Sequence, residues 1–408
     1  MKTSQIVDCR LQISNCLRSS VGILRFAFCI LIFAFSSSAS AQSFFNSRGL
    51  GEITPAGDAR IAALAEPSAL STLNPGIFVN LNQTSFSVTA LGAATVGTQG
   101  ANSRLLPNIR PATFNVATPL PFQARLFAGI NQKFGQDFDV WSESLADTAY
   151  RRHIIGRGGI YALRAGLAKS LFGKVCIGAE YGHIVGGSRE NWRFELEQGG
   201  YTSTDTVEID YSGNTFKVGA SLQTRIFSLA GYYEPQISMN VQRYKRVHGA
   251  VGDTTRTYHI SLPQSLSFAG SLSPTRRLGF DLGLTLNPWS GATITRNDSV
   301  SRLGFGNVWR GSIGAEYDID SLHPVRIGYS QQTWYYGTPS DQFMPPTAIK
   351  ENGIHFGTSV PIPKFGSLDI SGELLFRNSY TIKETAGRLM LTLAYSEAWA
   401  KRTRRWGY

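Results

Sequence analysis

Apolar and polar residues alternate along much of this chain, in segments separated by stretches without a clear pattern. In residues 277–287, all leucine and phenylalanine side chains fall on one face, while Gly, Asp, Thr and Asn side chains fall on the other. A period of two residues is typical of β-strands whose two faces meet different surroundings. The pattern predicts fourteen strands, at residues 84–91, 111–118, 123–134, 158–169, 174–185, 214–223, 227–246, 262–271, 277–287, 307–318, 324–333, 352–362, 367–378 and 386–396.

The connections between these strands alternate between short and long. Short turns at one end and long loops at the other are typical of an outer-membrane barrel, whereas a soluble sandwich has no reason to sort its connections in this way. A closed barrel also pairs every backbone N–H and C=O group inside the bilayer. We therefore predict an all-β fold, an antiparallel transmembrane β-barrel of about fourteen strands over residues 84–396. With both termini in the periplasm, the outward loops would be 92–110, 135–157, 186–213, 247–261, 288–306 and 334–351.

In such a barrel the apolar strand faces would meet lipid, and the polar faces would line the lumen. These charges could hold a plug or form a polar path, or they could be paired charges with a structural role. The charged residues expected in the lumen are Arg164, Glu180, Lys217, Asp281, Arg310, Glu316, Arg326, Glu373 and Arg377.

Residues 1–41 have the three parts of a secretory signal peptide. Basic residues precede the apolar run at 26–35, and Ala39-Ser40-Ala41 supplies a small-residue cleavage site. The apolar run is too short to span a bilayer, which needs ~18 residues, although an N-terminal anchor remains the alternative interpretation. We expect the mature chain to begin at residue 42.

Residues 42–83 lack sustained alternation. The alanine-rich stretch 59–65 predicts a short helix with Asp58 as its N-cap, and Asn74-Pro75-Gly76 predicts a tight turn. A barrel of this size has an interior wider than its own side chains fill. The segment would therefore either trail in the periplasm or fold inside the lumen as a plug. In the plug, we expect Arg60 to pair with a lumen carboxylate.

These features resemble the FadL-like long-chain fatty acid transporters of the Gram-negative outer membrane. Residues 59–65 and Asn74-Pro75-Gly76 are similar to the family's N-terminal hatch, and 313–317, 325–330 and 353–357 are similar to its late strands. The resemblance implies passive uptake of long-chain fatty acids or similar apolar compounds, captured at the outer loops and gated by a hatch. The hatch residues would be Arg60, Asn74, Pro75 and Gly76. Gly76 replaces the family's usual alanine, and residues 397–408 extend beyond the last strand.

Within that family, the long segments 135–157 and 186–213 are candidate capture elements. The segment 135–157 could form a helix whose apolar face binds the ligand, with nearby cations that bind the carboxylate of the ligand. Alternatively, this apolar face could pack on the rim of the barrel. The expected helix face comprises Trp141, Leu145, Ala149 and Ile155. The neighbouring cations are Arg151, Arg152 and His153.

Composition, charge and the absence of known motifs argue against several other classes of function. Charged residues are 16% of the chain, below the roughly 25% usual for soluble proteins, and the net charge is +11. Basic clusters with interleaved aromatic residues are confined to the C-terminus, so no nucleic-acid partner is predicted. None of the 6 histidines has a metal-site spacing, and no nucleophile elbow occurs. We predict no catalytic residue, no enzyme activity, no metal and no cofactor.

The tail at 397–408 contains the basic run 401–405. It could be solvated in the periplasm, or it could bind anionic headgroups, peptidoglycan or a periplasmic or secretion partner. The other expected partners are membrane lipid, lipopolysaccharide and an apolar small molecule. Alternative functions are a FadL-like barrel acting as a structural or secretion-system component, an outer-membrane lipid-modifying enzyme, and an open porin.

Overall fold

The computed structural model describes residues 43–47, 49–54, 57–80, 83–99, 102–144, 150–196, 202–247, 254–320, 323–337, 348–362, 366–378 and 383–397. The expected signal peptide, Leu145 and residues 398–408 lie outside the described residues. Within the described ranges, no helix has both the length and the apolar character that a membrane crossing requires.

The strands are β1 (Glu52–Ile53), β2 (Thr84–Gln99), β3 (Asn102–Leu120), β4 (Ala124–Gly135), β5 (Phe138–Ser144), β6 (Tyr150–Leu171), β7 (Val175–Leu196), β8 (Thr202–Gln223), β9 (Phe227–Glu234), β10 (Ile237–Arg246), β11 (Thr254–Leu262), β12 (Ser265–Leu272), β13 (Leu278–Asn287), β14 (Thr293–Arg296), β15 (Ser299–Arg302), β16 (Val308–Asp318), β17 (Pro324–Gly337), β18 (Ala348–Ile362), β19 (Gly366–Asn378) and β20 (Lys383–Glu397). The helices are α2 (Ala59–Ala63) and the 3-10 turns η1 (Phe44–Ser47), η2 (Ser68–Leu70), η3 (Pro75–Asn80) and η4 (Trp289–Gly291).

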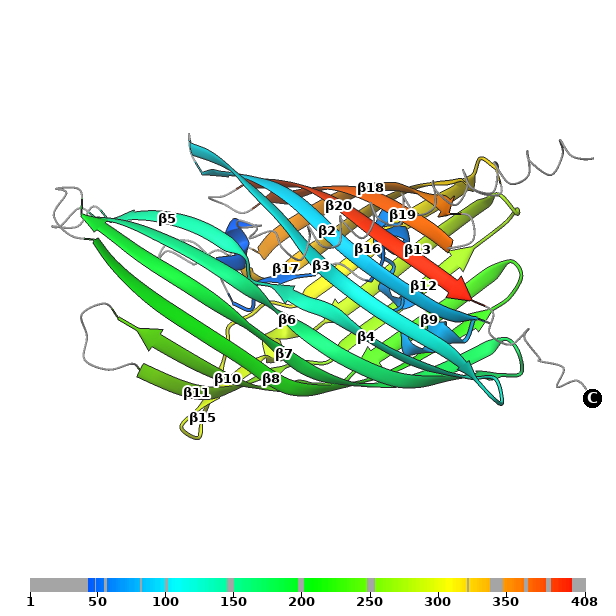
Figure 1. Cartoon of the computed structure of the whole chain (residues 1–408), viewed down its shortest axis with the longest axis horizontal. Helices are drawn as coiled ribbons and strands as arrows, with labels where there is room; N and C mark the ends of the chain where they lie inside the picture. Colours follow the sequence, from blue (N-terminus) through cyan, green and yellow to red (C-terminus); the bar gives the residue numbers. More distant parts are fainter. Residues whose placement is uncertain are drawn as a thin grey trace, which may run out of the picture.

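These strands close into one barrel (Figure 1). β20 pairs antiparallel with β2, so the last strand meets the first and the backbone ladder is continuous. Several consecutive labels, such as β9 and β10, are halves of one barrel strand, because both pair with β8. Counted in this way, the described strands form a closed antiparallel barrel of 14 strands, which confirms the predicted fold class.

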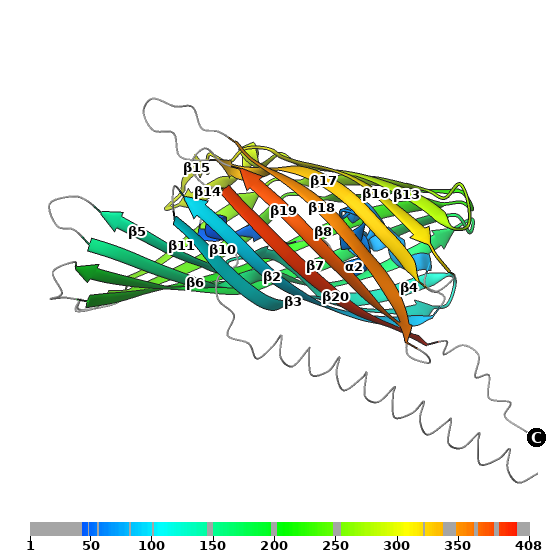
Figure 2. The ribbon, with the colours of Figure 1, turned by 90° about the horizontal axis from the view of Figure 1, so that it is seen from above.

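The predicted outer loops 92–110, 135–157 and 186–213 are mostly strand in the described residues, so their predicted bounds were wrong. Residues 92–110 belong largely to β2 and β3, and β7 pairs with β8 out to Glu195 opposite Thr202. Alternation fades before backbone pairing ends, because beyond the bilayer the outward face also meets water and needs no apolar side chains. The outer parts of β5, β6, β7 and β8 extend past the ends of the other strands (Figures 1 and 2).

Residues 43–47, 49–54 and 57–80, which we call the N-terminal segment, lie inside the barrel (Figure 2). α2 packs against β18, β19 and β20, and η3 packs against β6, β7 and β8. The predicted N-cap is present, because Asp58 Oδ1 accepts a hydrogen bond from Ile61 N at 2.9 Å. Ala59, Ala62 and Ala63 are fully buried. Small side chains therefore let this short helix approach the wall closely.

The strands between β12 and β19 follow the predicted division of faces. Leu282 and Ile327 point outward and are about 60% exposed, at 58% and 60%. Their neighbours Asp281 and Arg326 are buried on the inside. The wall thus presents an apolar surface to its surroundings and charges to the N-terminal segment.

Candidate functional site

The half of the lumen nearer the long-loop end is apolar, which the sequence analysis did not predict. Inward side chains from the outer parts of the strands join Phe45 and Leu50 of the N-terminal segment in one buried cluster. Trp289 stacks on Tyr335 with ring centroids 4.3 Å apart. The Tyr335 hydroxyl donates to Gly51 O at 2.6 Å and accepts from Leu50 N at 3.0 Å. Other members are Ile160, Ile184, Met239, Val241, Ile260, Trp334 and Ile349.

A one-residue irregularity in the wall produces part of this apolar interior. Val218 lies opposite Tyr233 in β9, but Asn214 lies opposite Ser238 in β10, so the register changes by one across Pro235 and Gln236. A shift of one residue moves every following side chain to the other face. The apolar residues of β9 therefore face outward, whereas those of β10 face the lumen. Proline at the junction was the sequence signal that could have indicated this change.

A cavity of about 170 Å³ lies between the N-terminal segment and the wall. One part of its lining is apolar, and another part carries charges. The apolar lining comes from Phe134, Ile237, Leu262, Trp289 and Val308. The charged lining comes from Lys133, Lys217, Glu234, Arg310 and Glu66. Lys133 Nζ lies 2.5 Å from Glu234 Oε1, so the charges already have partners.

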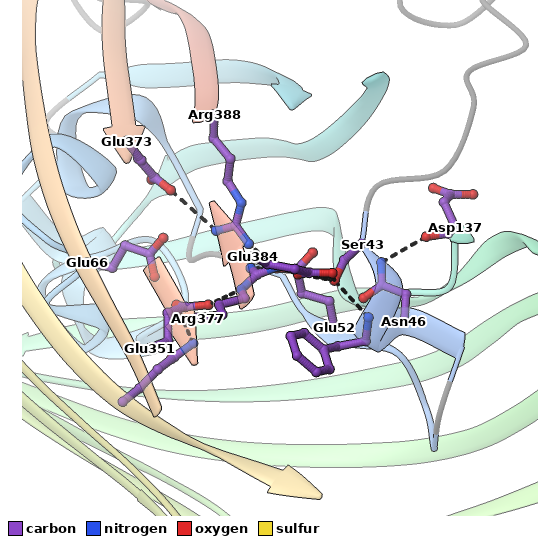
Figure 3. Close-up of polar contacts among 12 residues, drawn as sticks. Ser43, Asn46, Glu52, Glu66, Asp137, Glu351, Glu373, Arg377, Glu384 and Arg388 are labelled. Carbon is purple, nitrogen blue, oxygen red and sulfur yellow. Dashed lines mark hydrogen bonds and ion pairs between the residues drawn. The ribbon is translucent and has the colours of Figure 1, made fainter. Parts of the chain in front are cut away.

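Buried ion pairs attach the start of the N-terminal segment to the wall (Figure 3). Glu52 Oε1, from β1, accepts hydrogen bonds from both Arg377 of β19 and Arg388 of β20. Arg377 also contacts Glu351 Oε2 at 2.5 Å and Glu384 Oε2 at 3.2 Å. Burial alone would raise the pKa of Glu52, but the two guanidinium groups hold that pKa below its ordinary value. We call these five residues the carboxylate–arginine cluster.

The wall charges predicted from sequence point into the lumen, and the structure brings most of them into pairs. Arg60 Nη2, for which we expected a lumen carboxylate, lies 3.5 Å from Glu316 Oε1. Arg310 of β16 contacts Glu66 of the N-terminal segment. The other pairs are Arg164 with Glu180 at 3.0 Å, Lys217 with Glu180 at 3.8 Å, Arg326 with Glu316 at 2.5 Å, and Arg388 with Glu373 at 3.3 Å.

Asn74-Pro75-Gly76 forms a turn seated against the inner face of β7 and β8. The Asn74 side chain donates to Ala69 O at 2.8 Å and Ala220 O at 3.2 Å, and it accepts from Gly76 N at 2.9 Å. A Cβ on Gly76 would lie 2.9 Å from Ala220 Cα, a backbone atom that cannot yield easily. Close approach to the wall thus accounts for glycine at this position.

The residues proposed for ligand capture do not come together as predicted. The expected loop helix is wrong for the described residues, because Trp141 lies in β5 opposite His153 of β6. The two rings stack with centroids 3.8 Å apart. Arg152 lies on the other strand face, with its guanidinium 5.5 Å from the Trp192 ring centroid. Arg151 is in β6, opposite Glu143 of β5 and Glu195 of β7. Leu145 and Ala149 lie outside the described residues.

A serine, a histidine and a glutamate lie in a row on the lumen side of β17, β18 and β19. Ser330 Oγ is 2.8 Å from His355 Nε2, and His355 Nδ1 is 3.8 Å from Glu373 Oε1. All three residues are at most 2% exposed. Because Ser330 is closed off from any ester in this arrangement, we treat the row as part of the buried polar network.

Asp58 leads to a prediction about pH. Burial raises its pKa from 3.8 to about 6. Because the folded protein holds this proton more tightly, the stability that Asp58 contributes is complete below pH 3.8 and is lost as the pH rises through about 6. Asp58→Asn keeps an N-cap acceptor for Ile61 N and should remove this loss. Unfolding temperatures of both proteins between pH 4 and pH 8 would test it, and parallel curves would contradict it.

A closed barrel with an apolar outer surface defines the chain as an outer-membrane β-barrel. The chain belongs to the BamG family, whose model matches residues 17–405.

Solved structures show that the fold of this barrel is FadL-like. A FadL homologue of Pseudomonas aeruginosa is 13% identical over 85% of this chain and 99% of that one, with a TM-score of 0.60. A deletion mutant of TodX, a monoaromatic hydrocarbon channel, is 12% identical over 84% and 99%, with a TM-score of 0.57. The toluene transporter TodX of Pseudomonas putida is 13% identical over 89% and 100%, with a TM-score of 0.50. At these identities the likeness concerns the fold alone. No curated protein matches the chain.

Proposed function

We propose that this protein is an outer-membrane channel for passive uptake of hydrophobic molecules, such as long-chain fatty acids or similar apolar compounds. The observation that carries the proposal is the cavity of about 170 Å³ beside the N-terminal segment. Its apolar lining, with Leu262 and Trp289, suits a hydrocarbon, and Lys133 or Lys217 could meet a polar end group. Each CH₂ removed from water contributes ~0.8 kcal/mol, so entry requires no other energy source.

In this proposal, residues 42–83 are the hatch. A ligand enters from the long-loop end, where the buried apolar cluster would receive it after Phe45 and Leu50 move aside. The carboxylate–arginine cluster would keep the hatch closed at rest. The remaining parts of the chain are a signal peptide at 1–41, the barrel at 84–396 and a periplasmic tail at 397–408. We propose a transport role without enzyme activity.

Organic extraction and mass spectrometry of the purified full-length barrel would test this function. We expect an apolar molecule bound in stoichiometric amount. Leu262→Trp should fill the cavity and weaken binding roughly tenfold, since a ligand would then overpack the site at a cost of about 1–3 kcal/mol. Val300→Trp is the matched control, because Val300 is 64% exposed on β15. Absence of any apolar molecule, or equal retention in both variants, would contradict the proposal.

A second candidate is a structural or secretion-system component that binds a protein partner. Two observations favour it: buried ion pairs fix the N-terminal segment in the lumen, and β5 to β8 extend beyond the other strands (Figures 1 and 2). A barrel that retains a protein through the extended strands or through residues 397–408, with no apolar ligand inside, would favour this candidate over the channel.

A further inference from the structure

A hollow of about 1060 Å³ lies on the outside of the barrel, over β6, β7, β8, β9 and β12. We call it the outer groove. Small side chains form its floor: Ala220 lies opposite Ile177 on one side and opposite Gly231 on the other, in one outward-facing row. Ala179 belongs to the next row. Large, half-exposed apolar side chains stand around this floor, namely Leu167, Leu229 and Phe268.

The N-terminal segment supports the groove from inside. Directly behind its floor, Gly178 lies opposite Gly219, and both face the lumen. A Cβ on Gly178 would lie 2.5 Å from the Pro75 carbonyl carbon, and one on Gly219 would overlap Asn74 Oδ1. The segment therefore supports the floor of the groove from the lumen side and prevents it from moving inward. A preformed site loses little freedom when it binds a flexible ligand.

Positive charge gathers at one end of the groove. Lys169 lines it and lies in the same outward row, opposite Ile177. Lys174 follows in the short turn between β6 and β7, after Phe172, whose side chain is 96% exposed. Phe172 has a φ of 54°, a left-handed conformation that phenylalanine rarely adopts.

We propose that the outer groove binds an acyl chain of an anionic glycerophospholipid from the periplasmic leaflet. Its phosphate would lie within reach of Lys169 and Lys174, at the end of the barrel where β2 begins and β20 ends. Surrounding lipid tails are as apolar as the groove, so its selectivity comes from shape and from charge rather than from the hydrophobic effect. This proposal is independent of the channel function, because the groove and the internal cavity lie on opposite faces of the wall.

Lipid exchange followed by native mass spectrometry would test the proposal. The full-length barrel is equilibrated with mixed micelles holding equal amounts of phosphatidylglycerol and phosphatidylethanolamine, and the retained lipid is counted. We expect one phosphatidylglycerol to be retained in preference. Lys169→Gln should lower the ratio of the two retained lipids about fivefold, the effect of one basic residue near a membrane surface. Ala220→Leu fills the floor and should lower retention of both lipids.

Two variants serve as controls. Ala315→Leu places the same bulk on β16, where Ala315 faces outward opposite Phe280. Arg277→Gln removes a cation from another short turn, away from the groove. Both should retain lipid as the unaltered protein does. The proposal is overturned if Ala220→Leu keeps full retention, if Lys169→Gln leaves the lipid ratio unchanged, or if the controls lose lipid to the same degree. Retention of a protein in the groove in place of lipid would also overturn it.

Discussion

Replacing Glu52 by alanine is expected to release the start of the N-terminal segment from the barrel wall. The carboxylate accepts hydrogen bonds from Arg377 and Arg388, whose side chains are at most 5% exposed. Removing one partner of a buried ion pair costs up to about 3–5 kcal/mol, and the full cost applies when the remaining charge has no other partner. Arg377 keeps Glu351 and Glu384, and Arg388 keeps Glu373, so the wall retains its own pairs while the segment loses its ion pairs with both arginines.

Planar-bilayer conductance and limited proteolysis would measure this release. We expect Glu52→Ala to show ion-conducting openings and faster cleavage within residues 43–80, while the barrel itself still migrates as a folded band in an unheated gel. Glu52→Gln, which keeps the size and the acceptor oxygen, should have a smaller effect.

A matched control separates this effect from a general change of charge. Glu208→Ala removes a carboxylate that lies 3.4 Å from Arg189, but both side chains are at least half exposed. Exposed pairs contribute 0–1 kcal/mol, so this variant should behave as the unaltered protein. If Glu52→Ala stays closed and resists protease equally well, the carboxylate–arginine cluster does not hold the segment.

The membrane-embedded parts of the strands could be predicted because the bilayer imposes a simple rule on them. The segment predicted at 277–287 coincides with β13, since each of its outward residues must be apolar. Beyond the bilayer that rule ends. The outer halves of β7 and β8 were therefore taken for a loop, although their backbone pairing continues.

The interior was harder to predict, because it depends on contacts between distant parts of the chain. Glu52 has no distinctive sequence context, and its partner Arg388 is 336 positions away. Only closure of the barrel brings the two together. Alternation predicted which charged side chains face the lumen, but not which of them pair with one another. Part of the apolar half of the lumen escaped prediction because a register change after Glu234 reverses the faces of β10.

Gly219→Ala is expected to unseat the turn at Asn74-Pro75-Gly76. The new Cβ would overlap Asn74 Oδ1 and lie 2.9 Å from Pro75 Cδ. Asn74 is fully buried, so its displacement also leaves the carbonyls of Ala69 and Ala220 without their donor. Overpacking costs about 1–3 kcal/mol, and each buried polar group left unpaired adds about 1–3 kcal/mol. A loss of about 3 kcal/mol or more is therefore expected.

The temperature at which the folded band disappears in gels would measure this loss, with Gly92→Ala as the matched control. Gly92 is also a strand glycine, but its nearest neighbour to a new Cβ would be Leu389 O at 3.8 Å, an ordinary contact. Asn74→Ala alone should destabilise the protein, yet combined with Gly219→Ala it should cost less than the sum, because the clash between the new Cβ and Asn74 Oδ1 disappears with the Asn74 side chain. Strict additivity of the two changes would show that the turn does not rest on Gly219.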